Sequence, residues 1–293
     1  MGFQGQKIDL PLIRSGKVRD VYSFRKDYLI VASDRISAFD YVIPTLIPNK
    51  GKILHKLSMF WFDFVKDIVP NHIISGNFDD FPVELKKYDC LRDRSMLVKK
   101  AERINIECVV RGYLAGSGWK EYQKSETVCA VRLPRGLRES SKIPEPIFTP
   151  SSKEENGKHD ENISFEEMVK RVGKNTAENL SNFSIELYKK VSDYVFDRGI
   201  ILADTKLEFG FCGDKIILID EVFTPDSSRF WEVSKYEDGK PQNSLDKQYV
   251  RDYLEQIGWD KLPPVPELPN EIVEEILKKY DNIYEKLTDE RIL

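Results

Sequence analysis

The feature that most restricts how this chain can fold is a hairpin pattern in its last third. Residues 205–211 and 215–220 are two runs of strand-like composition, separated by a short segment around Gly213-Asp214. A break of this length joins two antiparallel strands. The chain therefore contains at least one antiparallel pairing, which excludes an all-helical fold.

The same hairpin carries four acidic residues of the kind that strands usually avoid: Asp204, Glu208, Asp220 and Glu221. If the turn has three residues, strand alternation places Lys206, Glu208 and Asp220 on one face, whereas a two-residue turn places Glu208 and Asp220 on opposite faces. Two carboxylates and a lysine on one face suit a magnesium-nucleotide site. A solvated strand face with cross-strand ion pairs is the alternative explanation.

Further strands and helices follow from the periodicity of the apolar residues. The predicted strands are Val18–Tyr22, Tyr28–Ala32, Ser95–Lys99, Ile104–Val110 and Ile200–Ala203. The predicted helices cover residues 53–65, begin at the capping box Ser164–Glu167, span residues 180–195, and follow Pro269-Asn270. These elements predict an α+β chain whose N-terminal part is mainly antiparallel.

Residues 133–157 are unusual because four prolines lie within them: Pro134, Pro144, Pro146 and Pro150. Proline removes a backbone donor and fixes φ, so we expect a long loop without regular structure here. Loops of more than about 12–15 residues are usually functional or disordered. The polar run 150–162, which includes His159, favours a functional loop, while a charged surface loop has the same composition.

The composition indicates a folded protein and excludes several classes of partner. Its 45 Lys and Arg against 49 Asp and Glu give a net charge of −4, so we expect no nucleic-acid or membrane binding. The four cysteines and three histidines are scattered, which predicts a reduced, cytoplasmic protein without a zinc site. A bound metal would be a hard ion with oxygen ligands, such as Mg²⁺.

Three segments carry groups suited to anions: Gly16 with Lys17 and Arg19, Arg111 with Ser117 before Gly118, and Arg229 in the run 224–231. Cations two residues apart on a strand point the same way, and small residues leave backbone N–H groups accessible. Each segment also has a common structural explanation: a glycine turn, an arginine that closes a strand, and a Pro-Asp turn.

Five longer motifs identify a family. They are SDRISAFD at 33–40, ECVVRG at 107–112, PIFTPSSK at 146–153, DTKLEFG at 204–210 and DEVFTPDSSRFW at 220–231. With residues 16–22 and 246–251 they extend over nearly the whole chain. The chain resembles the phosphoribosylaminoimidazole-succinocarboxamide synthase family, and its monofunctional form is expected.

The resemblance implies a fold and a reaction. The fold would be a two-lobed, ATP-grasp-like α+β architecture, with an antiparallel β-rich lobe at residues 1–103, a larger α/β lobe at 104–293, and ATP between them. The reaction would join L-aspartate to the carboxylate of carboxyaminoimidazole ribonucleotide (CAIR) through an acyl phosphate, with ATP and Mg²⁺ as cofactors. The partners would be small molecules only, and the protein a monomer or a homodimer.

Site residues are carried over by position. For ATP the resemblance implies Gly16, Lys17 and Arg19 on the phosphates, the backbone at Lys99 and Ala101 on adenine, and Glu208 and Asp220 on nucleotide and magnesium. Lys206, Lys153 and Asp204 would form the catalytic set. For the substrate it implies Ser37, Asp40, Arg111, Ser117, Arg229, Lys247 and Arg251.

These assignments require Lys206, Glu208 and Asp220 to share one face, and so an odd-length turn in the hairpin. Two other functions remain open at this point. A small-molecule kinase would use the same magnesium-ATP site for simple phosphoryl transfer. An inactive nucleotide sensor would bind ATP without turnover, although intact Lys206, Glu208 and Asp220 argue against it.

Overall fold

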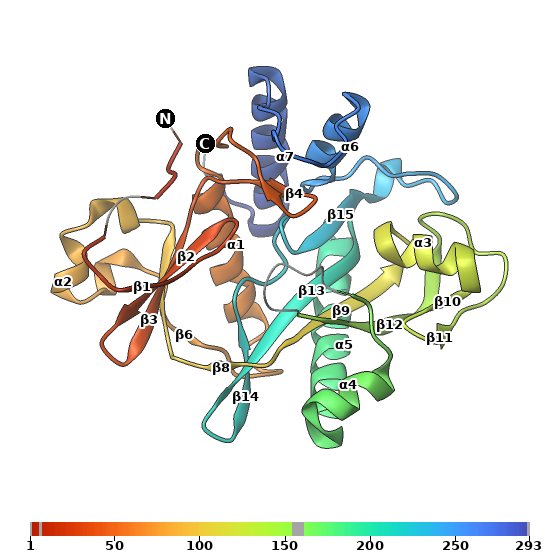
Figure 1. The fold of residues 1–293 in the computed structure, drawn as a ribbon, viewed down its shortest axis with the longest axis horizontal. Coiled ribbons are helices and arrows are strands. Elements are labelled where there is room, and N and C mark those ends of the chain that lie inside the picture. The colour runs from red at the N-terminus through yellow and green to blue at the C-terminus, as the bar shows by residue number, and fades with distance from the viewer. Residues whose placement is uncertain (1, 6–7, 154–160, 292–293) are drawn as a thin grey trace.

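A computed structural model of the chain describes residues 2–5, 8–153 and 161–291. Its strands form two main antiparallel sheets (Figure 1). The first has the order β1 (Leu12–Ser15), β2 (Arg19–Phe24), β3 (Asp27–Ala32), β7 (Ser95–Val98), β6 (Ile73–Ser75). The second has the order β12 (Lys142–Ser152), β9 (Ile106–Tyr113), β13 (Ile200–Cys212), β14 (Lys215–Ile219), with β15 (Ser228–Glu232) and β8 (Glu102–Arg103) also paired to β13.

Two short hairpins and a set of helices complete the fold. The hairpins are β4 (Ser37–Ala38) with β5 (Tyr41–Val42), and β10 (Thr127–Val128) with β11 (Val131–Arg132). The α-helices are α1 (Lys50–Phe64), α2 (Val83–Lys86), α3 (Gly116–Ser125), α4 (Phe165–Val172), α5 (Lys174–Phe196), α6 (Gln248–Gln256) and α7 (Asn270–Thr288). Short 3₁₀ turns occur at Phe78–Asp80, Asp89–Leu91 and Val233–Lys235. The mixed α and β content, the antiparallel pairing and helices α1, α4, α5 and α7 were predicted.

Strand β13 is the centre of the second sheet because it pairs with four other strands. Its first half lies between β15 and β9, and its second half pairs with β14 and β8. Leu202, Leu207 and Phe209 of β13 are buried in the same core, and a register shift between Leu202 and Asp204 lets residues five positions apart reach the same side. The polar side chains of β13 face the opposite side of the sheet.

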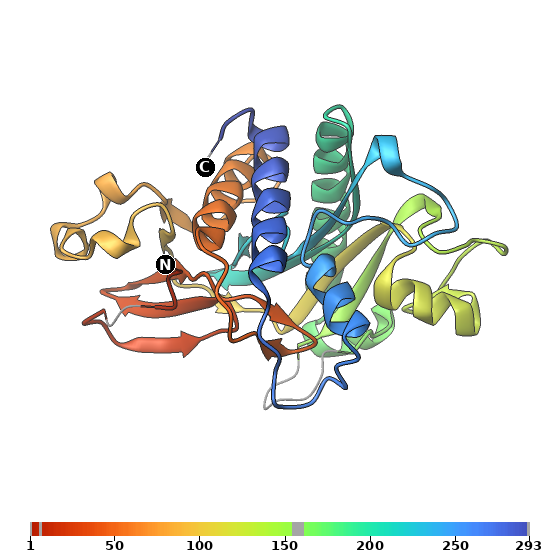
Figure 2. The same ribbon diagram turned by 90° about the horizontal axis from the view of Figure 1, so that it is seen from above.

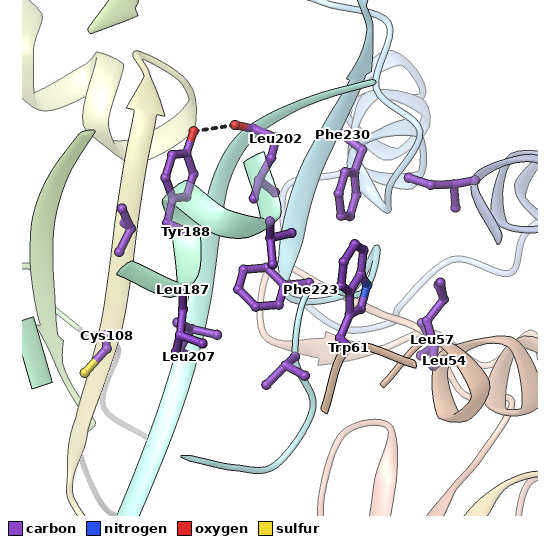
Figure 3. Close-up of a cluster of buried hydrophobic side chains, with 14 of the residues drawn as sticks. Leu54, Leu57, Trp61, Cys108, Leu187, Tyr188, Leu202, Leu207, Phe223 and Phe230 are labelled. Carbon is purple, nitrogen blue, oxygen red and sulfur yellow. Dashed lines mark hydrogen bonds between the residues drawn. The ribbon is translucent and has the colours of Figure 1, made fainter. Parts of the chain in front are cut away.

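Helices α1, α5 and α7 cover the same side of the sheets (Figure 2). Their apolar faces join the side chains of β9 and β13 in one large core. Trp61 of α1 is fully buried and packs edge-on against Phe223, in the same core cluster as Leu202 and Phe230 (Figure 3). Burial of an aromatic side chain of this size supplies several kcal/mol of hydrophobic stabilisation, roughly 25 cal/mol per Å².

The proline-rich segment differs from the prediction. Residues 142–152 form strand β12, where a loop without regular structure was expected. Strand β12 is the last strand of its sheet: it pairs along its length with β9, and on its other side an isolated bridge joins Ser151 to Asn162. Prolines are tolerated on an edge strand because one row of N–H groups has no partner to lose. Residues 154–160, which include His159, lie outside the described part of the chain.

The two sheets are connected through the chain itself and through backbone hydrogen bonds. The chain passes from β7 to β8 through residues 99–101, and so from the first sheet to the second. Near this crossing, the backbone of residues 70–72 pairs with Leu218 of β14: His72 N–H donates to the Leu218 carbonyl at 3.1 Å, and Leu218 N–H donates to the Pro70 carbonyl at 2.9 Å. Within the described residues, no helix is both long and apolar enough to cross a membrane.

Candidate active site

A cavity of about 620 Å³ lies where the first sheet meets the polar side of the second. It is lined by residues from β9, β13, the loop before β2, the β4–β5 hairpin and the segments on either side of β15. The predicted site residues that line it are Gly16, Lys17, Arg19, Ser37, Asp40, Arg111, Ser117, Lys153, Asp204, Lys206, Glu208, Asp220, Arg229, Lys247 and Arg251. Tertiary structure therefore brings together groups that are more than 200 positions apart.

The remaining two predicted residues, Lys99 and Ala101, are not among those that line the cavity. They lie in the crossing between β7 and β8, where the Lys99 N–H donates to the His72 carbonyl at 2.7 Å. Their assignment concerned backbone contacts with adenine. It stays a prediction.

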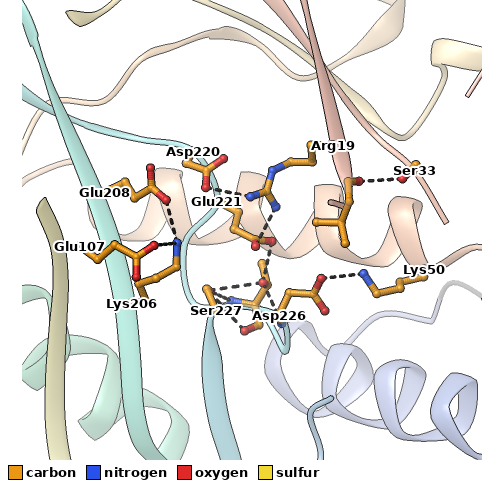
Figure 4. A network of polar contacts seen from close by, with 12 residues as sticks. Arg19, Ser33, Lys50, Glu107, Lys206, Glu208, Asp220, Glu221, Asp226 and Ser227 are labelled. Atoms are coloured by element: carbon orange, nitrogen blue, oxygen red, sulfur yellow. Dashed lines mark hydrogen bonds and ion pairs between the residues drawn. The ribbon is translucent and has the colours of Figure 1, made fainter. Parts of the chain in front are cut away.

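One end of the cavity holds lysines and carboxylates in direct contact. Lys206 Nζ lies 2.7 Å from Glu208 Oε1 and 3.3 Å from Glu107 Oε1 (Figure 4). Lys153 Nζ also pairs with Glu208 and lies 3.5 Å from Glu107 Oε1. We call Lys153, Lys206, Glu107 and Glu208 the acid–lysine cluster.

Burial and charge oppose each other in the acid–lysine cluster, and charge prevails. Burial alone would raise the pKa of Glu208, but Lys206 and Lys153 hold that pKa well below its usual value. Burial would likewise lower the pKa of Lys206, but Glu208 and Glu107 raise it. Both groups are therefore charged at neutral pH, with each charge neutralised by its partners.

The hairpin turn overturns one prediction. Cys212 pairs with Lys215, so the turn has two residues, and Glu208 lies opposite Ile219. In a regular ladder this register sends Glu208 and Asp220 to opposite faces. Asp220 nevertheless lines the same cavity, because β14 ends at Ile219 and Asp220 adopts a left-handed backbone conformation with φ of 67°. A backbone turn, and not strand parity, brings the two carboxylates together.

Asp220 and Glu221 are held by a single arginine from the first sheet. The Arg19 guanidinium lies 2.8 Å from Asp220 Oδ2 and 2.7 Å from Glu221 Oε1 (Figure 4). Burial would lower the pKa of Arg19, but these two carboxylates raise it. The contact spans the cavity and joins β2 to the end of β14. Within the described residues, no group of three or more His, Cys, Asp and Glu side chains has metal-binding geometry.

The other end of the cavity is built around Asp204. On β13 this residue lies directly opposite Arg111 of β9 and Arg229 of β15, and its carboxylate pairs with both guanidinium groups, at 3.2 Å for Arg111. Arg111 also donates to Ser117 Oγ at 3.0 Å and to Thr149 Oγ1 at 3.1 Å. The pairing of β9, β13 and β15 thus places Arg111 and Arg229 on either side of Asp204, with the Ser117 hydroxyl next to Arg111.

Two further cations complete this end without a carboxylate of their own. Lys247 and Arg251, at the start of α6, line the cavity, and within the described residues neither has a carboxylate within 4.0 Å. Burial lowers the pKa of Lys247 to about 8, with the positive charge of Arg251 adding to the effect and Asp226 opposing it. Burial and the charge of Arg229 likewise lower the pKa of Arg251. Arg111, Arg229, Lys247 and Arg251, with Ser117, form what we call the cation cluster.

The β4–β5 hairpin forms part of the cavity wall. Phe39 and Asp40 both have positive φ, of 48° and 70°, which is the conformation of a two-residue type I′ turn. Ser37 is buried at the base of this turn, while Asp40 at its tip forms an ion pair with Lys17. That ion pair is half exposed, so its contribution to stability is small.

The structure also places cavity residues that had no predicted role. Glu107 has the clearest signal in the sequence, because it precedes Arg111 by four positions on one strand and therefore shares its face. Asp226 lines the cavity and pairs at 2.7 Å with the fully buried Lys50 of α1. No sequence signal indicates this second pair, since its partners are 176 residues apart.

Known proteins match the chain over nearly its whole length. The family model described as SAICAR synthetase matches residues 12–266. The phosphoribosylaminoimidazole-succinocarboxamide synthase of Thermodesulfovibrio yellowstonii is 56% identical over 278 residues, with 94% of this chain and 95% of that protein covered. The enzyme of the same name from Desulfosudis oleivorans is 55% identical over 279 residues, covering 95% of both chains.

Solved structures show the same architecture. The SAICAR synthase of Saccharomyces cerevisiae, solved in complex with SAICAR, is 42% identical with a TM-score of 0.90, and the match covers 99% of both chains. A type-2 SAICAR synthetase in complex with ADP is 24% identical with a TM-score of 0.70, covering 96% of this chain and 99% of the other. The second likeness extends the similarity of fold to a distant relative.

Proposed function

The chain belongs to the SAICAR synthetase family, and we propose that it is the ATP-dependent ligase that joins L-aspartate to CAIR in purine biosynthesis. The products are the succinocarboxamide SAICAR, ADP and phosphate. The observation that supports this function best is one cavity with two different ends. The acid–lysine cluster suits phosphoryl transfer, and the cation cluster suits a phosphorylated substrate.

We propose that ATP lies between two lobes, residues 1–103 and 104–293, in an ATP-grasp-like arrangement. Gly16, Lys17 and Arg19 would cover its phosphates from the first sheet, and the backbone at residues 99–101 would contact adenine. Support comes from the position of residues 16–19 on the cavity wall and of residues 99–101 at the crossing between the sheets.

The donor set near Glu208 and Asp220 fits Mg²⁺. This ion usually binds to proteins through one or two carboxylates, with waters and substrate phosphates as its other ligands. Glu208 and Asp220 supply two carboxylates on one cavity wall. When bound, Mg²⁺ would neutralise charge on the transferring phosphoryl group. Lys153, Lys206 and Arg19, which now pair with these carboxylates, would be released toward anionic substrate oxygens.

The cation cluster is proposed to hold the ribonucleotide phosphate. Arginine forks match phosphate oxygens well, and Ser117 adds a hydroxyl donor. Asp204 was expected to belong to the catalytic set. Its contacts are with Arg111 and Arg229, so we propose that it positions these two side chains. Lys247 and Arg251 would supply the charge that a phosphate dianion needs, since they have no carboxylate partner of their own.

The chemistry then proceeds in two steps. A carboxylate oxygen of CAIR attacks the γ-phosphorus of ATP, the bond to the β-phosphate oxygen breaks, and ADP leaves. The amine of aspartate attacks the resulting acyl phosphate, a C–N bond forms, inorganic phosphate leaves, and the nitrogen loses a proton. Lys206 neutralises the charge between the two anions in the first step, which is mainly a problem of positioning and electrostatics.

Dependence on aspartate tests the function. Purified protein is incubated with ATP, Mg²⁺ and CAIR, with or without L-aspartate, and ADP and the amide are quantified separately. We expect ADP and amide in equal amounts when aspartate is present, and without aspartate no more ADP than a single turnover of the first step produces. Full ADP release without aspartate, and no amide on its addition, would indicate a kinase instead. Binding of ATP without any turnover would indicate a sensor.

A further inference from the structure

The loop before β2 is held by hydrogen bonds from one arginine of the 33–40 motif. Arg35 Nη2 donates to the carbonyl of Gly16 at 3.1 Å, and Arg35 Nε donates to the carbonyl of Lys17 at 3.2 Å. The next carbonyl, that of Val18, accepts from Ser33 N at 2.9 Å and from Ser33 Oγ at 2.8 Å (Figure 4). Three successive carbonyl groups of the loop, those of Gly16, Lys17 and Val18, therefore accept hydrogen bonds from residues 33–35.

The remaining donors of Arg35 fix the guanidinium itself. Nη2 and Nη1 donate to the two oxygens of Asp20 at 2.8 and 3.3 Å, and Nη1 also donates to the Gln4 carbonyl at 2.8 Å. Asp20 is buried and is also bonded by Ser15 Oγ at 2.7 Å. All the polar atoms of the guanidinium are thus engaged, and the plane of the group has one orientation.

The direction of these carbonyls decides where the loop's N–H groups point. In a planar trans peptide group the C=O and the N–H point in opposite directions. With the carbonyls of Gly16 and Lys17 turned toward Arg35, the N–H groups of Lys17 and Val18 point away from it. Within the described residues, neither N–H group has a protein acceptor. Gly16, Lys17 and Val18 all line the cavity.

We propose that Arg35 is a positioning residue for nucleotide binding: it turns the 16–18 peptide groups so that the N–H groups of Lys17 and Val18 face the phosphates. A flipped peptide group would present a carbonyl oxygen to an anion, which is repulsive. Gly16 permits the sharp turn, since a Cβ at this position would lie 2.9 Å from the Arg19 carbonyl oxygen. The inference rests on the proposed function, in which this loop covers the phosphates of ATP.

The test compares Arg35→Lys with Arg25→Gln. Lysine keeps the positive charge beside Asp20 but does not bridge two carbonyls, so the fold is retained while the fork is lost. Arg25 is an exposed arginine of the same sheet, with Glu84 as its ion-pair partner, and its replacement is the control. ADP affinity is measured by calorimetry, the three KM values by steady-state kinetics, and stability by thermal unfolding.

For Arg35→Lys we expect roughly tenfold weaker ADP binding and a similar rise in the KM for ATP, as for the loss of one charge-assisted hydrogen bond. The KM values for CAIR and aspartate should stay within twofold of wild type. Hydrogen exchange at Lys17 and Val18 with ADP bound should be faster than in the wild type. Ser33→Ala should produce the same pattern with a smaller amplitude. Arg25→Gln should match the wild type in every measurement.

Two results would overturn the proposal. ADP affinity unchanged in Arg35→Lys would exclude the positioning role, and an equal rise in all three KM values would make the residue merely structural. Lys17→Ala distinguishes a wrong role for Arg35 from a wrong role for the loop as a whole. If it weakens ADP binding while Arg35→Lys does not, the loop contacts the nucleotide and only the role of Arg35 is wrong. If neither variant affects ADP, the proposed phosphate-covering role of the loop is also wrong.

Discussion

The two ends of the cavity differ in how their charges are balanced. In the acid–lysine cluster every charged group already has an opposite partner, and the pKa of Glu208 and that of Lys206 both move so as to favour the charged form. In the cation cluster Lys247 and Arg251 have no such partner among the described residues, and their pKa values move toward the neutral form. In the proposed function, the first end would exchange partners when substrates bind, whereas the second would gain an anionic partner.

This difference predicts which kinetic constant each end controls. Groups that exchange partners act on the charge that develops during phosphoryl transfer, so their loss lowers kcat. Groups that wait for an anion act on substrate binding, so their loss raises a KM.

The largest effect is expected for Lys206→Met, which removes a cation proposed to neutralise charge between the two anions during phosphoryl transfer. We expect kcat to fall by about 10²–10³-fold, the usual effect of losing one electrostatic donor at a reacting centre. Glu208 keeps Lys153 as a partner, so the fold should persist. Lys215→Met, at an exposed position of the same hairpin, is the matched control. A fall in kcat no larger than that of the control would remove Lys206 from the chemical step.

A somewhat smaller effect is expected for Asp220→Asn, which removes one proposed magnesium ligand. The KM for magnesium-ATP should rise by about 10–100-fold, as for loss of a group that supports a metal site, while the KM for CAIR stays close to wild type. Kinetics at several Mg²⁺ concentrations measure this, because excess metal should partly restore activity. Asp214→Asn in the exposed turn serves as control. Unchanged use of magnesium-ATP would show that Asp220 only holds Arg19.

For Arg229→Ala we expect the KM for CAIR to rise by about tenfold, with little change in the KM for ATP. One charge-assisted hydrogen bond to phosphate is worth this amount. Arg132→Ala, at an exposed position of β11, provides the comparison. Equal weakening toward all three substrates would assign Arg229 a structural role beside Asp204.

The smallest effect concerns pH. Because the pKa of Lys247 is lowered to about 8, this side chain loses its charge between pH 7 and pH 9. The neutral amine attracts phosphate less, so the KM for CAIR should rise with pH over this window, by less than about tenfold. Lys247→Gln should start from a higher KM and show a flatter pH profile. A wild-type KM for CAIR that stays constant from pH 7 to pH 9 would contradict the proposed difference between the two ends of the cavity.

Much of the fold follows from local patterns. Helices α1, α5 and α7 were predicted from apolar spacing, since a helix that covers a sheet must be apolar on one face, and α4 was predicted from its capping box. The proline-rich segment was predicted incorrectly, because the same prolines suit both a loop and an edge strand. Edge position depends on which strands pair across the chain, and no local pattern reports it.

Family motifs in the sequence identify the reaction, and all but two of the residues assigned by the resemblance line the cavity. Tertiary structure alone decides how those residues meet. The hairpin turn has two residues, so strand parity predicts that Glu208 and Asp220 lie on opposite faces. Asp220 nevertheless joins Glu208, because Asp220 itself adopts a left-handed backbone conformation. Likewise, Arg35 lies 19 positions from Gly16, yet it orients the loop's peptide groups. Residue type determines which chemistry is available. Backbone dihedrals and long-range pairing determine where side chains and peptide groups point, and both depend on contacts between distant segments.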